Sequence, residues 1–409
     1  MRAHGFAAPA FLTVALVAVL GAGLVGVAPA WASTTVDCGS GASLQAAIDQ
    51  APAGSTLALA GTCGGTFEIS KSITLKASMG DPPPTLDAQG AGTTLTITHG
   101  EVHLDGLTIT GGQATEGAGI SNSGKLWLDR TTVTGNTASD GGGILNNGIL
   151  QLTRSSVSSN GTPVDIDVCE GVHPDEGIWN MGKLVLLGSA VNSNCGGGIW
   201  NQGGSLLLEQ SSVSANLGDD AADAVGIENE ASAMITDSTV SYNNGEIGFT
   251  AGILNRGSMT ISFSTIARNV TGDSFGGAAG ITNGGGGKLI VTSSTISANF
   301  DDAVTGAGIE NGDPEERLKP GTVKISGSIL AGNGEGDCLG PITSEGFNIV
   351  GTLFGYPDCR SRLNRRISSA AIPPPLIPTS GCSGPTGAPR RPCPPTEKVS
   401  PSMPFPLVL

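Results

Sequence analysis

The residues best suited to chemistry in this 409-residue chain are carboxylates gathered in short stretches. Asp219, Asp220 and Asp223 form one dense stretch, and other acidic stretches recur along the chain. Clustered carboxylate oxygens are ligands that Ca²⁺ prefers. The three aspartates therefore predict a calcium site, although no stretch carries the Asp-x-Asp-x-Asp-Gly motif of a dedicated calcium loop. The alternative is a solvated acidic face that keeps the protein soluble.

Two tryptophans form the second candidate site. Trp179 and Trp200 both lie in Gly-Ile-Trp-Asn segments, so they occupy the same position of a repeated unit. Stacked aromatic rings that are exposed can bind the apolar face of a sugar. The pair is therefore a candidate for sugar stacking. The alternative is a covered hydrophobic patch, because the long insertion from Gly161 to Gly177 directly precedes Trp179.

Side chains for acid–base catalysis are sparse. Glycoside hydrolysis needs two converging carboxylates, and adjacent acids occur at Asp219-Asp220 and Asp301-Asp302. His99 lies far upstream of both pairs. We assign no catalytic residue, and the sequence favours a protein that is not an enzyme.

A repeated step must position these side chains. An Ile-x-Asn step preceded by glycine occurs eight times, at intervals of 24, 34, 21, 28, 26, 28 and 28 residues. Repeats of this kind indicate stacked structural units, and the unequal intervals indicate insertions between the steps. The steps are Ile120/Asn122, Ile144/Asn146, Ile178/Asn180, Ile199/Asn201, Ile227/Asn229, Ile253/Asn255, Ile281/Asn283 and Ile309/Asn311.

Each unit continues with two more short apolar segments and a second Asn. In the first full unit these are Leu126, Leu128, Val133 and Asn136. Apolar residues at positions i and i+2 face one side of a strand. Three short strands per unit predict an all-β fold, a right-handed parallel β-helix. The Asn columns then lie inside or in turns, where amides can hydrogen-bond along the stack, so we interpret them as a structural ladder.

The N-terminal end of the stack needs a cap, because an open end exposes apolar residues and strand edges. The segment Ser43–Asp49 predicts a short amphipathic helix for this role. The spacing of the eight cysteines suggests four local disulfides in an oxidising compartment. The expected pairs are Cys38–Cys63, Cys169–Cys195, Cys338–Cys359 and Cys382–Cys393.

Charge and composition divide the chain into segments. Residues 1–32 read as a signal peptide, with Arg2 and His4 before an apolar run, the alternative being an uncleaved anchor. We expect the cap and first strands in 33–91, the coils in 92–359 and a disordered Pro- and Arg-rich tail in 360–409. A Pro-rich linker through a cell wall is the alternative for the tail.

The charge balance bears on partners. Residues 33–359 contain 12 Lys and Arg against 34 Asp and Glu. Nucleic-acid binding needs clustered cations, so we expect no nucleic acid partner. After signal cleavage no segment is apolar and long enough to span a membrane. The acidic turns between repeats should stack into a stripe along one edge.

The chain resembles the right-handed parallel β-helix proteins of the pectate-lyase-like superfamily over about 43–359. The Ser43–Asp49 segment with Ala53–Thr56 is similar to that family's cap, and Asp337–Gly351 is similar to the closing segment of secreted bacterial members. Elements such as Val133–Asn136 and Gly142–Ile144 resemble repeats of bacterial polymorphic outer-membrane proteins, which are surface-exposed or adhesive in character.

The resemblance implies the fold more strongly than the function, because this scaffold serves lyases, hydrolases and non-catalytic binders. The Arg-x-Pro-x-x-Arg run of pectate lyases is absent, and the polygalacturonase-like segments occur only as fragments such as Asp219-Asp220, Asp301-Asp302 and His99-Gly100. We therefore expect a secreted or cell-surface, non-catalytic rod with a binding, adhesin-like or structural role. Its partner would be a carbohydrate or a surface protein. The alternative is a carbohydrate-active enzyme, either a polysaccharide lyase or a glycoside hydrolase.

Overall fold

The computed structural model describes residues 34–78, 82–161, 163–165, 168–169, 176–218, 224–245, 250–272, 277–301, 308–312, 319–334 and 336–351. All of them belong to one compact unit, Met1–Ala371. The expected signal peptide and the expected C-terminal tail lie outside the described residues. None of the helices within the described ranges has the length and apolar character to cross a membrane.

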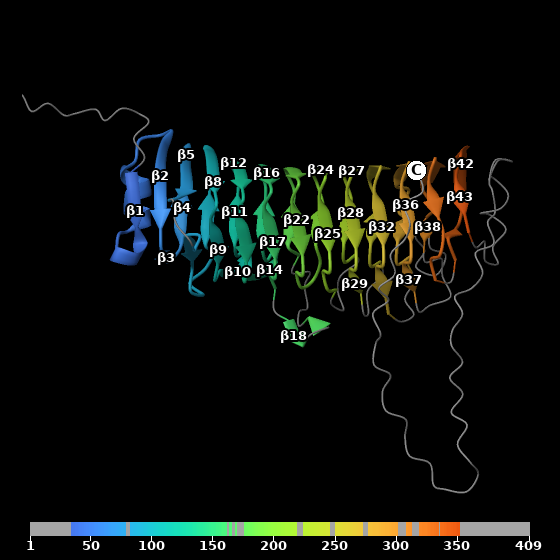
Figure 1. Cartoon of the computed structure of the whole chain (residues 1–409), viewed down its shortest axis with the longest axis horizontal. Helices are drawn as coiled ribbons and strands as arrows, with labels where there is room; N and C mark the ends of the chain where they lie inside the picture. The colour runs from blue at the N-terminus through green and yellow to red at the C-terminus, as the bar shows by residue number, and fades with distance from the viewer. Residues whose placement is uncertain are drawn as a thin grey trace, which may run out of the picture. The chain divides into compact units, whose positions relative to one another are not determined.

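Three parallel sheets run along the stack, and each regular coil gives one strand to each of them (Figure 1). Sheet A has 13 strands: β1 (Thr34–Asp37), β2 (Ser55–Ala60), β5 (Ile73–Ala77), β8 (Glu101–Asp105), β12 (Lys125–Asp129), β16 (Ile149–Thr153), β21 (Lys183–Leu187), β24 (Ser205–Glu209), β27 (Ser232–Thr236), β31 (Ser258–Ser262), β35 (Lys288–Thr292), β39 (Thr322–Ser326) and β42 (Ile342–Gly346).

Sheet B has 12 strands: β3 (Thr62–Gly64), β6 (Thr85–Asp87), β9 (Thr108–Thr110), β13 (Thr132–Thr134), β17 (Ser156–Ser158), β22 (Ala190–Asn192), β25 (Ser212–Ser214), β28 (Thr239–Ser241), β32 (Thr265–Ala267), β36 (Thr295–Ser297), β40 (Ile329–Leu330) and β43 (Ile349–Val350).

Sheet C has 11 strands and holds the Ile-x-Asn steps: β4 (Phe67–Ile69), β7 (Leu95–Ile97), β11 (Ile120–Asn122), β15 (Ile144–Asn146), β20 (Ile178–Asn180), β23 (Ile199–Asn201), β26 (Ile227–Asn229), β30 (Ile253–Asn255), β34 (Ile281–Asn283), β38 (Ile309–Asn311) and β41 (Cys338–Leu339).

Shorter strands form beyond sheet B, in the segments between coils. They are the parallel strands β10 (Gln113–Glu116) and β14 (Thr137–Asp140), the parallel strands β29 (Asn244–Gly245), β33 (Val270–Thr271) and β37 (Phe300–Asp301), and the antiparallel strands β18 (Pro163–Asp165) and β19 (Val168–Cys169).

The register of the sheets follows the repeat without slipping. Ile120 pairs with Ile144, and Ile144 pairs with Ile178, although 34 residues separate the second pair and 24 the first. The insertions are therefore confined to the connections between strands. The prediction of an all-β parallel β-helix is confirmed.

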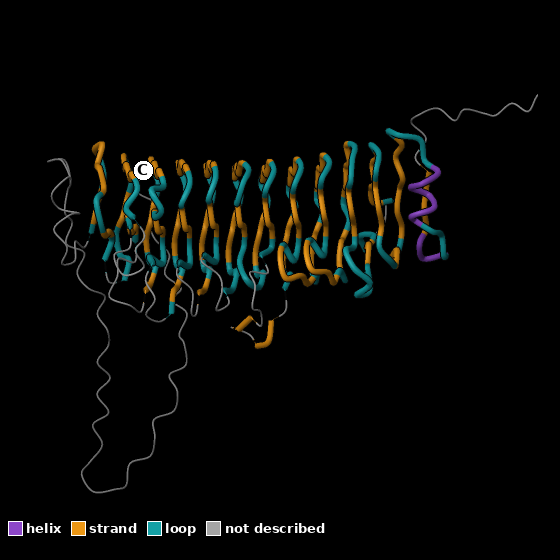
Figure 2. Tube along the Cα trace, turned by 180° about the vertical axis from the view of Figure 1, so that it is seen from behind, coloured by secondary structure: helices purple, strands orange, loops and turns teal. Residues whose placement is uncertain are grey.

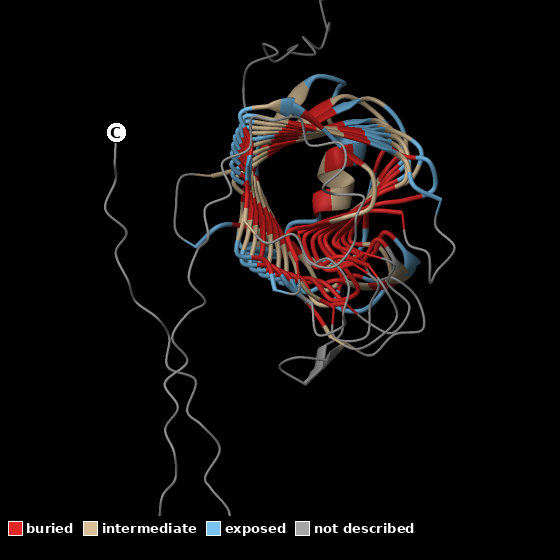
Figure 3. Cartoon of the chain, turned by 90° about the vertical axis from the view of Figure 1, so that its right-hand side faces the viewer, coloured by how far each residue is buried: buried red, intermediate tan, exposed pale blue. Residues whose placement is uncertain are grey.

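Aliphatic side chains fill the interior of the coils. In the end-on view, buried residues of successive coils form continuous bands along the stack, beside bands of intermediate and exposed residues (Figure 3). Phe67 is the one aromatic side chain in this core among the described residues. A narrow coil interior has room for one layer of Leu, Ile and Val per strand, which explains why aromatic residues make up only 4% of the chain.

Buried Asn side chains form two continuous ladders. In the first ladder, each Nδ2 donates to the Oδ1 of the next coil over 2.7–2.9 Å, from Asn122 through to Asn311. In the second ladder, the corresponding bonds of 2.9–3.0 Å run from Asn136 to Asn333. Asp337 ends this ladder by accepting from Asn333 Nδ2 at 2.8 Å. Both columns hold the scaffold together.

The structure adds a third ladder, made of hydroxyl groups, that the sequence analysis missed. The buried column begins at Thr131 and continues through Ser155 and Ser189 to Ser328. Each backbone N–H of the column donates to the hydroxyl one coil further on, as in Ser155 N to Ser189 Oγ at 3.1 Å. The turn between sheets A and B is thereby locked in every coil from β12 to β39.

The N-terminal end is capped as the amphipathic segment predicts. Helix α1 (Leu44–Gln50) covers the first coils, buries Leu44 and Ile48, and begins at the N-cap residue Ser43 (Figure 2). A 3-10 turn, η1 (Cys38–Ser40), precedes it, and a disulfide joins Cys38 to Cys63. Strand β1 extends sheet A beyond β2, a feature that the sequence analysis did not anticipate.

The remaining cysteines are partly described. A disulfide joins Cys169 to Cys195 and so ties the insertion after Gly161 to the coil wall. Cys338 is disulfide-bonded, and its expected partner Cys359 lies outside the described residues, as do Cys382 and Cys393.

Replacing Asn201 by Leu should strongly destabilise the fold. Asn201 Oδ1 accepts from Asn180, and its Nδ2 donates to Asn229 Oδ1 and to Ser232 O. The leucine leaves buried polar groups without partners, so we expect a loss of about 2–4 kcal/mol in the free energy of unfolding. Asn192→Leu, on the outward side of sheet B, is the control and should change it by under about 0.5 kcal/mol. Denaturant unfolding measures both, and equal losses would contradict the ladder's role.

Candidate functional site

The acidic residues proposed for calcium are not placed. Asp219, Asp220 and Asp223 lie outside the described residues, so the calcium hypothesis stays a prediction. Within the described ranges, His, Cys, Asp and Glu side chains nowhere gather in a group of three or more suited to a metal ion. Glu176, expected in the solvated acidic stripe, is instead buried against the coil wall, with its Cγ close to Gly197.

Trp179 and Trp200 do lie side by side, on the outward face of sheet C. The register pairs them across β20 and β23, and their rings stack with centroids 5.2 Å apart and planes inclined by 9°. Trp179 Nε1 donates to Gln202 Oε1 at 3.2 Å. Trp200 Nε1 is buried and makes no hydrogen bond within the described part of the chain.

The face that carries this pair is largely covered. In the same outward column, Leu145 precedes Trp179, Glu228 follows Trp200, and Leu254 and Thr282 come next. Leu145, Leu254 and Thr282 are buried although they point away from the core. Glu228 forms a half-buried ion pair with Arg256. This environment favours packing over ligand access, and a sugar-stacking role for the two tryptophans stays a prediction.

A second aromatic stack, which the sequence analysis missed, lies on the outward face of sheet A. His103 in β8 pairs with Trp127 in β12, and their ring centroids are 4.8 Å apart with planes 10° from parallel. Carbon atoms in contact are only about 3.5 Å apart, so a centroid distance of 4.8 Å means that the two rings are offset. The His103 side chain is 45% exposed, and its Nε2 lies 3.3 Å from Glu101 Oε1.

Charged groups line one edge of this stack. Asp105 and Asp129 end strands β8 and β12, directly across the register from one another. Arg130 bridges them, with an ion pair to Asp105 and another to Asp129 Oδ2 at 2.8 Å. In the next coil, Arg154 Nη2 donates to both carboxylate oxygens of Asp129, at 2.7 and 3.0 Å, and Arg154 Nε donates to Asp129 Oδ1 at 3.2 Å. Carboxylates and guanidinium groups thus alternate from coil to coil, and the half-exposed arginines keep N–H donors at the surface.

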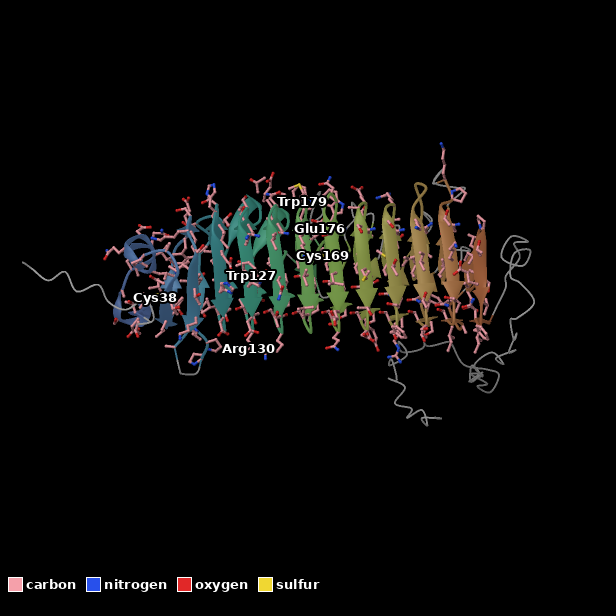
Figure 4. All side chains as sticks on the ribbon, turned by 90° about the horizontal axis from the view of Figure 1, so that it is seen from above. Cys38, Trp127, Arg130, Cys169, Glu176 and Trp179 are labelled. Atoms are coloured by element: carbon pink, nitrogen blue, oxygen red, sulfur yellow. A yellow bond between two sulfur atoms is a disulfide. The ribbon has the colours of Figure 1, made fainter. Side chains whose placement is uncertain are left out.

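Backbone geometry aims the two arginines outward. Arg130 and Arg154 occupy the turn from sheet A to sheet B, with left-handed φ angles of 47° and 49°. Neighbouring coils have glycine at the equivalent positions, Gly106 and Gly188. A shallow groove of about 540 Å³ begins at these arginines and continues to Asp237. Hydroxyl groups of sheet B form its floor. Figure 4 shows Trp127 and Arg130 in the N-terminal half of the stack, with Glu176 and Trp179 farther along.

An apolar stripe continues from the aromatic stack along sheet A. After Trp127 the outward central column reads Gln151, Val185, Leu207 and Met234, one residue per coil. Met234 is 51% exposed. Sheet A thus presents a polar edge at Asp105 and Asp129 and a stripe of ring and aliphatic surface beside it.

Comparison with known proteins adds similarity of fold only. No protein-family model matches the sequence, and no curated protein is found that is similar to it. Among solved structures, an alginate lyase from Paenibacillus sp. str. FPU-7 matches with a TM-score of 0.38 and 15% identity, over 77% of this chain and 99% of that one. Pectate lyase Pel9A matches with a TM-score of 0.35 and 14% identity, over 84% and 78%. We infer neither a family nor an activity from these matches.

The Trp179–Trp200 stack should contribute to stability as a coupled pair. Offset-stacked rings are worth about 0.5–1.5 kcal/mol beyond the area that they bury. We therefore expect Trp179→Ala, Trp200→Ala and the double variant to give a coupling energy of about 1 kcal/mol in denaturant unfolding. His103 and Trp127 provide the comparison pair on sheet A. If the losses in unfolding free energy of the two single variants add up to that of the double variant, the contact between the rings has no role in stability.

Proposed function

We propose that this protein is an exported, non-catalytic rod that binds carbohydrate chains on the outward face of sheet A. The observation that carries the proposal is the half-buried His103–Trp127 stack beside the ladder of Asp105, Arg130, Asp129 and Arg154. Sugars have apolar C–H faces and hydroxyl edges, so they suit a ring surface flanked by carboxylates and guanidinium groups.

The shape of the face suits a linear chain better than a single sugar. The stripe from Trp127 to Met234 crosses five coils, and the register keeps it straight. Coils repeat about every 4.8 Å, so successive sugar residues would meet the same arrangement of apolar centre and polar edge. Many weak contacts along one rigid surface then add to a useful affinity, because little ordering is needed on binding.

Binding fits this surface better than catalysis. A general acid for glycoside cleavage must be protonated, with a second carboxylate placed across the bond from it. Asp105 and Asp129 instead lie side by side on one edge of sheet A, and both form ion pairs with the neighbouring arginines. The groove beside them is shallow and does not enclose a substrate. The alternative is a carbohydrate-active enzyme on the same scaffold, which would release reducing ends or unsaturated sugars from a bound polysaccharide.

Export is part of the proposal. The apolar segment of residues 1–32 is typical of a signal peptide. The disulfides Cys38–Cys63 and Cys169–Cys195 suit an oxidising compartment. We propose that the protein acts outside the cell or at its surface, where a polysaccharide-binding rod would serve attachment.

Trp127→Ala should weaken polysaccharide binding. A microarray of soluble plant and microbial polysaccharides identifies the best ligand, and titration calorimetry then compares variants. Removing the indole should lower the affinity about ten-fold, since it deletes the ring face. Phe300→Ala is the matched control, because Phe300 is 49% exposed but lies in β37, beyond sheet B and away from the stripe on sheet A; the affinity of this variant should equal that of the wild type.

Two results would overturn this proposal. If the protein binds none of the polysaccharides on the microarray, the proposed function is wrong. Release of reducing ends or of unsaturated sugars from the bound polysaccharide by the wild-type protein would replace it with the enzymatic alternative.

A further inference from the structure

Hydroxyl side chains cover the outward face of sheet B. Each three-residue strand turns its first and third residues outward, and from β9 to β36 these positions are mostly Thr or Ser. The first column reads Thr108, Thr132, Ser156, Ala190, Ser212, Thr239, Thr265 and Thr295; the second reads Thr110, Thr134, Ser158, Asn192, Ser214, Ser241, Ala267 and Ser297.

This face carries no charge over those eight coils of the described structure. The outward face of sheet A over similar coils holds Lys125, Asp129, Lys183, Glu209 and Lys288. A strand face that only needs to be soluble normally gains Lys or Glu. Intrinsic strand propensity favours Thr but does not favour Ser. The uncharged hydroxyl array therefore indicates a partner that hydrogen-bonds to small side chains. Hydroxyl groups suit such a partner because each can both donate and accept a hydrogen bond.

The hydroxyls of this array are left for such a partner. Ser156 Oγ contacts Asn192 Oδ1 at 3.4 Å. Within the described residues, the hydroxyls of Thr132, Ser212, Thr239 and Thr265 make no hydrogen bond to protein. The buried hydroxyl column beginning at Ser155 is in contrast fully bonded from coil to coil.

The spacing of the array matches a network of water. Parallel ladders place equivalent hydroxyls about 4.8 Å apart along the stack, and the two columns about 6.6 Å apart along each strand. In a tetrahedral water network, neighbouring oxygens lie about 2.75 Å apart, so oxygens that share a neighbour lie about 4.5 Å apart. One water can thus bridge hydroxyls of adjacent coils, and the column continues that arrangement over many coils.

We propose that the outward face of sheet B binds the ordered water lattice of an ice surface. A crystal repeats in two dimensions, so it can meet hydroxyls of both columns in several coils at once, which a soluble flexible ligand cannot do. The backbone register holds the hydroxyls in place before contact, so little entropy is lost when the lattice forms on them. This proposal rests on the hydroxyl columns of sheet B, whose first column also lines the groove beside Arg130 and Arg154, and it does not involve the aromatic stack on sheet A.

Partition of the full-length protein into a slowly growing ice fraction tests the proposal, together with measurement of the gap between melting and freezing points. We expect enrichment of the wild type in ice over a non-binding protein of similar size. Thr239→Lys with Thr265→Lys places two hydrated ammonium groups on the array and should lower the enrichment about ten-fold. Thr236→Lys with Ser262→Lys, on sheet A of the same coils, should leave it unchanged.

Wild-type protein that stays in the liquid fraction and leaves the freezing point unaltered would overturn the proposal. Equal enrichment of the sheet B variant and the wild type would also overturn it, because the array would then be irrelevant. Thermal unfolding of both double variants shows whether a lower enrichment comes from the altered surface of sheet B or from an unfolded protein. Polysaccharide titrations on the same samples report independently on sheet A.

Discussion

The whole structure depends on buried amides that must find partners in the next coil. Asn180 and Asn201 lie where no water can reach them, and each amide donates to the carbonyl oxygen of its successor. A shift of one residue in any strand would turn this polar column toward the core or the solvent and leave several groups unpaired. The ladders therefore impose one register on all three sheets, and insertions can occur only between strands.

Because the register is fixed, equivalent outward positions of successive coils are aligned along the stack. The outward faces of the three sheets therefore carry different kinds of side chain. Sheet A carries the His103–Trp127 stack and its charged edge, sheet B carries hydroxyl columns, and sheet C is largely covered. Two side chains far apart in sequence meet on such a surface if they occupy the same place in the repeat. A binding surface on this protein is thus formed by residues at the same outward position in successive coils, and no single residue makes it alone.

The sequence predicted the scaffold well because its signal is periodic. The Ile-x-Asn steps and the second Asn column correctly predicted the strands, their register and the inward direction of the amides. The Ser155 column went unnoticed, although Ser or Thr stands two residues before the Val or Ile of sheet B in almost every coil. That signal is weaker, since Ser is common in turns for other reasons.

The candidate site was harder to predict. Trp127 lies in a regular unit, but His103 belongs to an upstream coil in which Leu95 and Ile97 replace the Ile-x-Asn step. The apolar pair Val102 and Leu104 does align with Leu126 and Leu128 in the sequence, but it does not show that the rings between them stack. Arg130 and Arg154 belong to no motif that singles them out in the sequence. Their grouping with Asp105 and Asp129 follows only from the register between coils.

The central claim is that a polysaccharide lies against Trp127 on sheet A. Indole emission reports on this contact directly in a Trp179→Phe, Trp200→Phe variant, in which Trp127 is the one tryptophan left among the described residues. Titration with the best-bound polysaccharide should shift or quench that emission along the same saturation curve that calorimetry gives. Saturable binding by calorimetry with unchanged Trp127 emission would place the ligand elsewhere and contradict the account.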